Sequence, residues 1–558
     1  MELLYIWIDG FRNFQNIGFN ISDTFDIEYN RETGLLSINE ARKSSNVFGD
    51  NITNITGIIG KNSTGKSNLL ELVSLILKSK KNTLTFDFIA LFNSDYMRDS
   101  QMFIYSNIHS EIKTNSSFGL INNSDEFNHL NVAYFSNIQD DRELNIPRSV
   151  INLTPSKSLP KRKSDMLNQF KFLLTEDFLG VDLESPKNLI ISTITKTSYN
   201  RDKEYMSNFD NDALQVISGK FKNALKTSNP IKHFIYSFTF SLFSYIIVTA
   251  VNEIKNRRKD LFEVNPDYSN LNELFTKSFK DVANLDMKDL IEAIKEFIGL
   301  VFYEFTTLGS LNKKDAMSLL DFDRAIEYLH PRLIKEGKYN QARSYYLIDF
   351  NSENKRILKE YLSIFNQNQI IELSWGGISS GHKAFLNVFS QFNSVIKKIN
   401  NKPNVLILID EGDLYMHPVW QQEFLNRILN YLKSNYKADI QMIMTSHSPF
   451  LVSDLPRQNL IYLDRTEEYM CKVIPIKESE DETFGANLLD LYSNSFFLSG
   501  GTISKFAYGK IKEVVEKLKR KDLSKQDFDS MNGIISIIGD DVIKLKLKKM
   551  ITDAENRN

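Results

Sequence analysis

Gly60-Lys61-Asn62-Ser63-Thr64-Gly65-Lys66-Ser67 is the stretch that decides the fold of this 558-residue chain. It fits the phosphate-loop pattern GxxxxGK[ST]. The apolar run Ile52 to Ile59 before it predicts a β-strand, and the leucines and isoleucine of Asn68 to Leu77 after it recur at the spacing of an amphipathic helix. The pattern therefore stands between a strand and a helix, which is the context in which such a loop binds nucleotide phosphates.

The residue types of the loop have distinct expected roles. Backbone N–H groups of the loop and of the helix start surround the phosphates in such sites. We expect Lys66 to reach the β and γ oxygens and the Ser67 hydroxyl to ligate Mg²⁺. The predicted cofactors are ATP and Mg²⁺, and the predicted nucleotide-binding residues here are Gly60, Lys61, Asn62, Ser63, Thr64, Gly65, Lys66, Ser67 and Asn68.

A second predicted strand ends in two carboxylates. Val405 to Ile409 is an unbroken apolar run followed by Asp410 and Glu411. Such a run predicts a strand that is buried on both faces and ends at a ligand site. We expect Asp410 to hold Mg²⁺ through water, and Glu411 to orient or deprotonate the attacking water. The alternative is a core strand with an acidic end.

The next predicted strand ends beside a histidine. Ile440 to Met444 is apolar and runs into Thr445-Ser446-His447-Ser448-Pro449. A histidine is often only a structural residue. In this position, after the strand that follows the Asp-Glu strand, His447 is a candidate sensor of the γ-phosphate. Glu411 and His447 are therefore the predicted catalytic residues.

A further segment predicts a second anion-binding site. Ser374 to Lys383 contains Gly376, Gly377, Ser379 and Gly381 and precedes the helix-like stretch Ala384 to Ile399. Small residues and a serine at the start of a helix place N–H groups and a hydroxyl where they can bind an anion. One chain does not need two such sites for one nucleotide.

The order of phosphate loop, serine-glycine segment, Asp-Glu strand and histidine resembles the ABC-type ATPases of the SMC, RecF and OLD group, which includes the Rad50-like heads. The resemblance implies a homodimer or higher oligomer that holds ATP between two heads, with Ser379 and Gly381 of one subunit closing on the nucleotide of another. His382 stands where the group usually has glutamine or glutamate. Ser63 replaces a usual glycine, so it has to adopt the backbone geometry that this position demands.

The resemblance also implies roles for two other segments. Arg12 and Asn13, after the first predicted strand, match a segment that approaches the nucleotide in Rad50-like heads; a polar turn is the alternative. Tyr134 to Gln139 matches the region of the Q-loop, where Asn137 and Gln139 both have suitable chemistry for the metal. The sequence does not choose between them.

Composition favours a globular cytoplasmic protein. The chain is 42% hydrophobic and 25% charged, and a net charge of −2 gives no global attraction to nucleic acid. The single cysteine, Cys471, excludes an intramolecular disulfide and suits a reducing compartment. Met1 to Ile8 lacks a basic start and predicts a strand rather than a secretion signal.

Phe234 to Asn252 carries no charge and is followed by the basic residues Lys255, Arg257, Arg258 and Lys259. Its length raises the question of membrane insertion. Five serine and threonine residues interrupt it, and it would be the only such segment. We expect a buried helix of a helical lobe and no membrane partner.

These segments predict an α/β fold in which an ABC-type P-loop ATPase head is split by a mainly helical insertion. The expected domains are the first half of the head (1–144), the insertion (145–369), the second half of the head (370–500) and a helical C-terminal tail (501–558). Helical spacing within the insertion predicts helices over Leu285 to Phe305, Ala316 to Leu329 and Arg356 to Phe365. Pro155 to Lys163 is expected to be a flexible basic loop.

Both ends of the chain resemble the PtuA ATPase subunit of Septu anti-phage systems, including retron-associated forms. The matching segments are Leu4 to Phe19, and Ile534 to Asp541 with the lysine-rich helix after it. The resemblance implies an ATPase that works with an HNH nuclease (PtuB-like). In retron versions it implies a reverse transcriptase with its RNA–DNA hybrid, so that nucleic acid is reached through the complex.

Two alternatives remain open. One is a RecF-like DNA-repair ATPase without a nuclease. The other is a self-contained OLD-like nuclease, because Asp540-Asp541 after an apolar run resembles an acidic Toprim motif. The chain after His447 is too short to continue the head and then form a whole Toprim domain, so we expect no nuclease activity from this chain alone.

Overall fold

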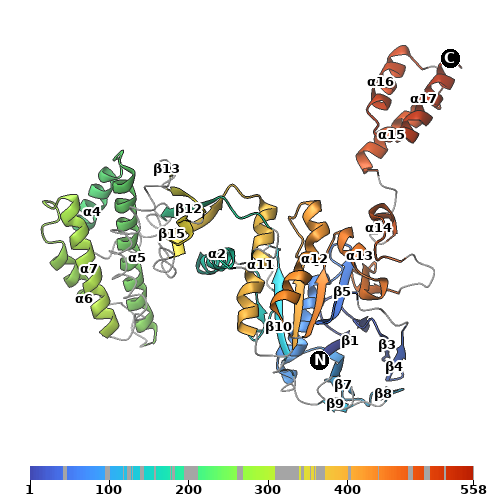
Figure 1. Ribbon diagram of the computed structural model, residues 1–558, viewed down its shortest axis with the longest axis horizontal. Helices are drawn as coiled ribbons and strands as arrows, with labels where there is room; N and C mark the ends of the chain where they lie inside the picture. The colour runs from blue at the N-terminus through green and yellow to red at the C-terminus, as the bar shows by residue number, and fades with distance from the viewer. Residues whose placement is uncertain are drawn as a thin grey trace.

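The computed structural model shows an α/β head, a group of helices at the far end of the molecule and a separate C-terminal helical unit (Figure 1). The predicted α/β fold class is confirmed. The structure describes residues 1–41, 47–94, 101–116, 119–121, 127, 130–138, 144–155, 159–175, 178, 183–193, 211–260, 268–307, 338–340, 345–351, 353–356, 358–359, 371–399, 404–437, 439–475, 482–494, 503–520 and 523–556.

The head is built on a seven-stranded sheet with the order β11-β10-β16-β17-β5-β18-β19. All neighbouring pairs are parallel except β18 with β19. The strands are β5 (Ile52–Gly60), β10 (Leu130–Ser136), β11 (Ile151–Asn152), β16 (Asn404–Asp410), β17 (Asp439–Thr445), β18 (Leu460–Arg465) and β19 (Cys471–Ile474). β5, from the first part of the chain, therefore lies between β17 and β18 from the last part, and β10 pairs with β16. The segments after β5, β16 and β17 meet at one edge of the sheet.

The unbroken apolar run of β16 is explained by helices on both faces of this sheet. Leu406 and Leu408 pack in the cluster that contains α1 (Lys66–Lys78). Ile407 and Ile409 pack in the cluster that contains α11 (Ser380–Ile399) and α12 (Pro418–Asn435). A strand that is buried on both faces has apolar residues at successive positions, without the alternation of apolar and polar residues seen in half-exposed strands.

The helix expected over 68–77 is confirmed as α1 (Lys66–Lys78), but it is buried more completely than its amphipathic spacing predicts. Every residue from Lys66 to Leu77 except Asn68 is buried. The helix lies in a cluster that joins the central sheet to a second sheet, of order β2-β1-β6-β7-β9, so apolar residues cover it on opposite sides. The strands of the second sheet are β1 (Glu2–Asp9), β2 (Ile17–Asn20), β6 (Asp87–Ser94), β7 (Gln101–Ser106) and β9 (Gly119–Ile121). A smaller sheet contains β3 (Phe25–Asn30), β4 (Leu35–Glu40) and β8 (Lys113–Thr114).

The insertion contains helices and a four-stranded antiparallel sheet of order β13-β14-β12-β15. Its strands are β12 (Asn188–Thr193), β13 (Lys338–Asn340), β14 (Tyr345–Asp349) and β15 (Ile371–Gly376), and its helices are α2 (Leu159–Leu173), α4 (Asn211–Ala224), α5 (Pro230–Asp260), α6 (Ser269–Ser278) and α7 (Met287–Thr307). Because β15 pairs with β12, this sheet crosses the predicted boundary at residue 369, and the domain limits stay predictions.

Some predictions within the insertion can be compared with the structure. The helix expected over 285–305 is confirmed as α7. The segment 316–329 and most of 356–365 lie outside the described residues. The basic loop expected at 155–163 is wrong in its second part, because α2 begins at Leu159 and takes Lys161, Arg162 and Lys163 into a helix.

The charge-free segment lies in α5. Within the described residues, Pro230–Val248 is long and apolar enough to cross a membrane, but 61% of that window is buried inside the protein. The buried Phe243 contacts the rings of Phe275, Phe279 and Phe297 from α6, its C-terminal end and α7. These contacts identify α5 as a core helix of a helical lobe.

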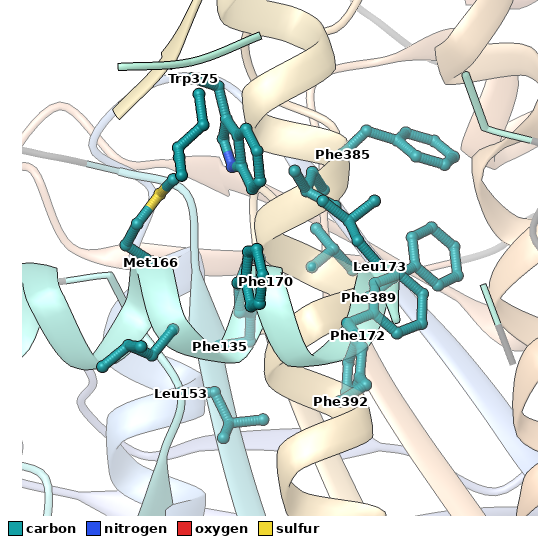
Figure 2. Close-up of a cluster of buried hydrophobic side chains, with 14 of the residues drawn as sticks. Phe135, Leu153, Met166, Phe170, Phe172, Leu173, Trp375, Phe385, Phe389 and Phe392 are labelled. Atoms are coloured by element: carbon teal, nitrogen blue, oxygen red, sulfur yellow. The ribbon is translucent and has the colours of Figure 1, made fainter. Parts of the chain in front are cut away.

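The base of the insertion packs on the head through α2 and α11. Figure 2 shows Phe170 and Phe172 of α2 beside Phe389 and Phe392 of α11, with Trp375 of β15 above them. Phe135, at the end of β10, joins the same cluster. This apolar contact connects the insertion to the helix that begins in the serine-glycine segment.

The C-terminal tail contains three helices with their own small core: α15 (Lys505–Lys517), α16 (Lys525–Ser536) and α17 (Asp541–Glu555). The apolar run Ile534 to Ile538 ends α16 and is not a strand. Asp540 is the N-cap of α17, and its carboxylate accepts hydrogen bonds from the backbone of Val542 and Ile543. The acidic pair thus starts a helix, which removes the reason for likening it to a Toprim motif. The head also contains α13 (Pro449–Asp454) and α14 (Leu488–Asn494).

The packing of α5 makes a testable prediction. Phe243→Ala should lower the free energy of unfolding of the helical lobe by about 3–5 kcal/mol, because it leaves a cavity among three other rings. Chemical denaturation followed by circular dichroism measures the change. Tyr303→Ala on α7 is the control, because Tyr303 is 70% exposed and its loss should change stability by less than ~1 kcal/mol. Equal stability of the two variants would contradict the buried placement of α5.

Candidate nucleotide site

The loop between β5 and α1 borders a cavity of about 750 Å³. Its lining brings together distant parts of the sequence, namely Arg12, Asn13, Asn62, Ser63, Thr64, Gly65, Lys66, Ser67, Asn68, Ile138, Glu411 and His447. Of the predicted loop residues, Gly60 ends β5, and Lys61 places its ammonium 3.2 Å from the carboxylate of Asp464 on β18. The cavity therefore combines loop amides, a lysine, a carboxylate and an imidazole.

The backbone of the loop explains its glycines and its serine. Gly65 has φ +103°, and a Cβ there would lie 2.7 Å from the ring of Phe14. A Cβ on Gly60 would lie 2.5 Å from the carbonyl oxygen of Leu463. Ser63 has φ +65°, the left-handed conformation, which costs a non-glycine residue roughly 1–2 kcal/mol. The sequence argument that Ser63 must accept a geometry suited to glycine is consistent with this angle.

Lys66 is folded back against its own loop. Its Nζ donates to the carbonyl oxygens of Gly60 at 2.9 Å and Lys61 at 3.2 Å, and the residue is buried. These bonds hold the ammonium beside the cavity, where anionic phosphate oxygens would be stronger acceptors than neutral carbonyls.

Asp410 is fully buried, and its carboxylate collects hydroxyl groups from three different elements. Oδ1 accepts from Ser67 Oγ at 3.0 Å and from Thr445 Oγ1 at 2.6 Å, and Oδ2 accepts from Tyr134 OH at 3.2 Å. Two of the predicted Mg²⁺ ligands, Ser67 and Asp410, are thus in direct contact. A hydroxyl beside a carboxylate is a fitting donor set for Mg²⁺, which takes one or two protein oxygens and completes its shell with water and phosphate.

The described residues contain no group of three or more His, Cys, Asp or Glu side chains that could hold a metal by itself. Ser67 and Asp410 are the residues that would hold Mg²⁺ here.

Glu411 has a strained backbone. Its φ is +48°, and its N–H donates to both the carbonyl oxygen and the hydroxyl of Thr445, at 3.1 and 3.0 Å. Glu411 Oε1 lies 3.4 Å from Nε2 of His447, and both side chains reach the cavity with 17% and 40% exposure. A left-handed residue fixed by neighbouring bonds is typical of functional sites. The geometry places the two predicted catalytic residues together.

Arg12 and Asn13 are part of a network around the first turn of α1. Asn13 Nδ2 donates to the carbonyl oxygen of Thr64 at 3.1 Å, and Asn68 Nδ2 donates to Asn13 Oδ1 at 2.8 Å. Arg12 donates to Asn68 and forms an ion pair with the buried Glu71 at 2.7 Å. Both predicted residues line the cavity, and their bonds brace the phosphate loop.

Ser379 and Gly381 do not line this cavity. Ser379 Oγ accepts the N–H of His382 at 3.1 Å and so caps the start of α11, and Ser379 is exposed. A Cβ on Gly381 would lie 2.9 Å from the carbonyl oxygen of Tyr415, so the first turn of α11 needs a glycine there. His382 packs against Trp420, and burial lowers the pKa of its imidazole. Ser379 is thus exposed to solvent and Gly381 is buried, and neither residue lines the cavity.

Of the two metal candidates in the Q-loop region, Asn137 is among the described residues and Gln139 is not. Asn137 is buried, and its amide donates to the carbonyl of Gly412; Ile138, not Asn137, lines the cavity. Gln139 lies outside the described residues. The choice between them stays open.

Sequence reasoning missed the residues that fix the two acids. Thr445 and Tyr134, which donate hydroxyl hydrogen bonds to Asp410, have no role assigned from the sequence. One signal was available for Thr445: a polar residue at the carboxyl end of a buried parallel strand beside Asp410.

A family model described as "AAA domain, putative AbiEii toxin, Type IV TA system" matches residues 55–453. The chain belongs to this family. The matched span runs from β5 through the phosphate loop and the insertion to His447, so the AAA domain family covers the lining of the cavity except Arg12 and Asn13.

Similar proteins include ATPases associated with retrons. Retron Vc95 probable ATPase of Vibrio cholerae serotype O1 biovar El Tor is 25% identical over 248 residues, which are 40% of this chain and 46% of that protein. Retron Ec83 probable ATPase of Escherichia coli is 29% identical over 122 residues (21% and 22%). Septu protein PtuA of Bacillus mycoides (strain KBAB4) is 26% identical over 166 residues (27% and 22%). The chain thus spans less than half the length of the relatives it matches.

Solved structures that align with this chain include the recombination mediator protein RecF. The two chains are 11% identical, the alignment covers 85% of this chain and 98% of that chain, and the TM-score is 0.26. The Smc head domain of Pyrococcus furiosus aligns at 13% identity, 85% and 96% coverage and a TM-score of 0.25. At these scores the likeness adds nothing to what the sheet order itself establishes.

The bonds of Thr445 predict the effect of removing its hydroxyl. Thr445→Val keeps the shape of the side chain but leaves Asp410 and the strained Glu411 each short of a hydrogen bond. We expect ATP turnover at saturating ATP to fall about 10- to 100-fold, while ATP binding changes little. Thr445→Ser keeps the hydroxyl and should retain most of the turnover. Single-turnover hydrolysis compares the variants, and a fast Thr445→Val enzyme would contradict the assigned role.

Proposed function

We propose that this protein binds and hydrolyses ATP at the cavity beside the phosphate loop. The observation that carries the proposal is the convergence of Lys66, Ser67, Glu411 and His447 on one cavity, although they come from segments far apart in sequence. Asp410 is buried beside the cavity and accepts a hydrogen bond from Ser67. Membership of the AAA domain family supports it.

Each side chain has a step that its position allows. Loop amides and Lys66 would bind the phosphates, the ammonium exchanging carbonyl oxygens for phosphate oxygens. Ser67 and Asp410 would hold Mg²⁺, which neutralises charge on the β and γ phosphates. Glu411 would orient the attacking water and accept its proton, because its carboxylate reaches the cavity. His447, 3.4 Å from that carboxylate, would donate to the γ-phosphate and hold Glu411 in place.

The position of Ser379 supports a site that is completed by a second copy. Its hydroxyl oxygen caps α11, and neither Ser379 nor Gly381 lines the cavity that would hold the nucleotide of their own chain. In a dimer of heads they would face the γ-phosphate of the other subunit, and hydrolysis would reopen the pair.

The resemblance to Septu and retron ATPases supports a role in anti-phage defence. We propose a nucleotide-gated sensor that restrains or releases a partner HNH nuclease, with a reverse transcriptase and RNA–DNA hybrid in a retron-associated complex. Cytoplasmic location and contact with nucleic acid through the complex belong to this proposal. A RecF-like repair ATPase without a nuclease is the outcome that would replace it.

Two substitutions separate binding from hydrolysis. Glu411→Gln keeps a side chain of the same size without a base, so it should bind ATP about as tightly as the parent and lose at least ~100-fold in turnover. Lys66→Ala should lose ATP binding. Binding of a fluorescent ATP analogue and phosphate release are the measurements, with thermal unfolding as the control for folding. Hydrolysis by Glu411→Gln at the parent rate would disprove the catalytic assignment.

The partner can be tested from the natural gene neighbourhood. The tagged chain, expressed with its neighbouring genes and purified gently, should carry an HNH protein, with or without a reverse transcriptase and branched RNA–DNA. Mass spectrometry and nuclease digestion identify both. A solitary ATPase dimer that binds gapped DNA in an ATP- and salt-dependent manner would favour the repair function instead.

A further inference from the structure

Gln169 of α2 bonds both flanks of the segment that holds Ser379. Its Oε1 accepts the indole N–H of Trp375 at 2.8 Å, and its amide donates to Oδ1 of Asn387. Trp375 lies in β15, just before the segment 377–379, and Asn387 lies in α11, about two turns after the helix begins at Ser380. One side chain from α2 thus bonds both to the strand that leads into the serine-glycine segment and to the helix that follows it.

These bonds lie in an apolar contact. Gln169 is 3% exposed, and the stacked rings of Phe170 and Trp375 lie 6.5 Å apart, with Phe350 edge-on to the indole at 5.1 Å. Figure 2 shows Trp375 above Phe170, beside the phenylalanines of α11. An amide or indole N–H without a partner in such surroundings costs about 1–3 kcal/mol. The packing is therefore compatible with few positions of α2 other than the one that pairs these groups.

A second pair repeats the arrangement one turn away. Gln391 Nε2 donates to Asp165 Oδ1 at 2.7 Å, and both residues are buried. Asp165 precedes Gln169 by four residues on α2, and Gln391 follows Asn387 by four on α11, so the two pairs form a ladder along facing helices. Hydrogen bonds need specific partners, whereas apolar rings can pack in several positions. The ladder therefore restricts the register of α2 against α11 more than the phenylalanine contacts could.

We propose that Gln169 is a positioning residue for Ser379. The proposal rests on the proposed function of Ser379 toward ATP held by a second copy. Ser379 caps α11 and follows β15, so its place is set by where that strand ends and that helix starts. Gln169 bonds to both elements. A displacement of about 1 Å at a group that contacts a reacting phosphate is costly.

The position of α2 also relates Gln169 to the Q-loop region. The chain enters α2 from β10 and β11, after the Q-loop region, and Phe135 at the end of β10 packs in the same cluster as Phe170. The insertion is therefore packed directly against the head. Its first helix contributes to the site that a second subunit would use.

Two substitutions test the proposal in a Glu411→Gln background, where bound ATP is not consumed. Trp375→Phe removes the indole N–H and keeps an aromatic ring, and Gln169→Leu removes both bonds. ATP should bind either variant with a Kd within about twofold of the parent, because the cavity is untouched. ATP-dependent association of two chains, measured by analytical ultracentrifugation, should weaken about tenfold or more. Ser390→Ala is the matched control, because its buried hydroxyl bonds back to Asn387 O within the same helix; it should associate like the parent.

The outcomes separate this inference from the function on which it rests. If the Glu411→Gln parent does not associate when ATP is added, the proposed function of Ser379 fails and the inference fails with it. If the parent associates and both variants associate equally well, the positioning role alone is refuted. If Gln169→Leu does not fold, as thermal unfolding would show, Trp375→Phe decides. Equal losses of ATP binding and association would indicate a merely structural role, which also refutes it.

Discussion

The carboxylate of Asp410 is the point on which the site depends. It lies at the end of β16 and accepts hydroxyl groups from α1, β10 and β17. A buried carboxylate is stable only when its oxygens are satisfied, so the three elements must approach it together. The same Thr445 hydroxyl that donates to Asp410 accepts the N–H of Glu411, whose backbone is strained. The Thr445 hydroxyl therefore holds both Asp410, the proposed metal ligand, and Glu411, the proposed base, so the positions of the two acids are coupled.

Much of this could be predicted from the sequence because the central strands and their polar ends are local patterns. The loop 60–67 and the strands ending at Asp410 and Thr445 each carry their own signal, and parallel strands bring their carboxyl ends to one edge. The burial of α1 could not be predicted. Its second cover is β1 and β6, and only the tertiary structure shows that these strands lie over a helix whose spacing suits a surface. The pairing of Gln169 with Trp375 was hidden for a similar reason, since 206 residues separate the two.

The structure also shows which polar residues belong to the site and which support it. Arg12 and Asn13 line the cavity, yet their bonds run to Glu71, Asn68 and Thr64, so they stiffen the loop whether or not they also contact a nucleotide. Ser379 and Gly381 lie apart, on a helix fixed by the insertion. The first set lines one cavity of the chain, whereas Ser379 is exposed and lines no part of it. This division is the physical reason for expecting a second subunit.

In the central sheet β5 lies between β17 and β18, which come much later in the chain, and this affects how the protein is made. Thr53 of β5 bonds to Ile440 of β17, 387 residues later in the chain. A ribosome adding roughly 5–20 residues per second would take about 20–80 s to bridge that interval. Throughout this time β5 has no partner in β17 or β18, and its apolar faces and unpaired backbone are exposed. The nascent N-terminal half is thus a natural client for chaperones, and the speed at which the insertion is translated and folds sets how long that protection is needed.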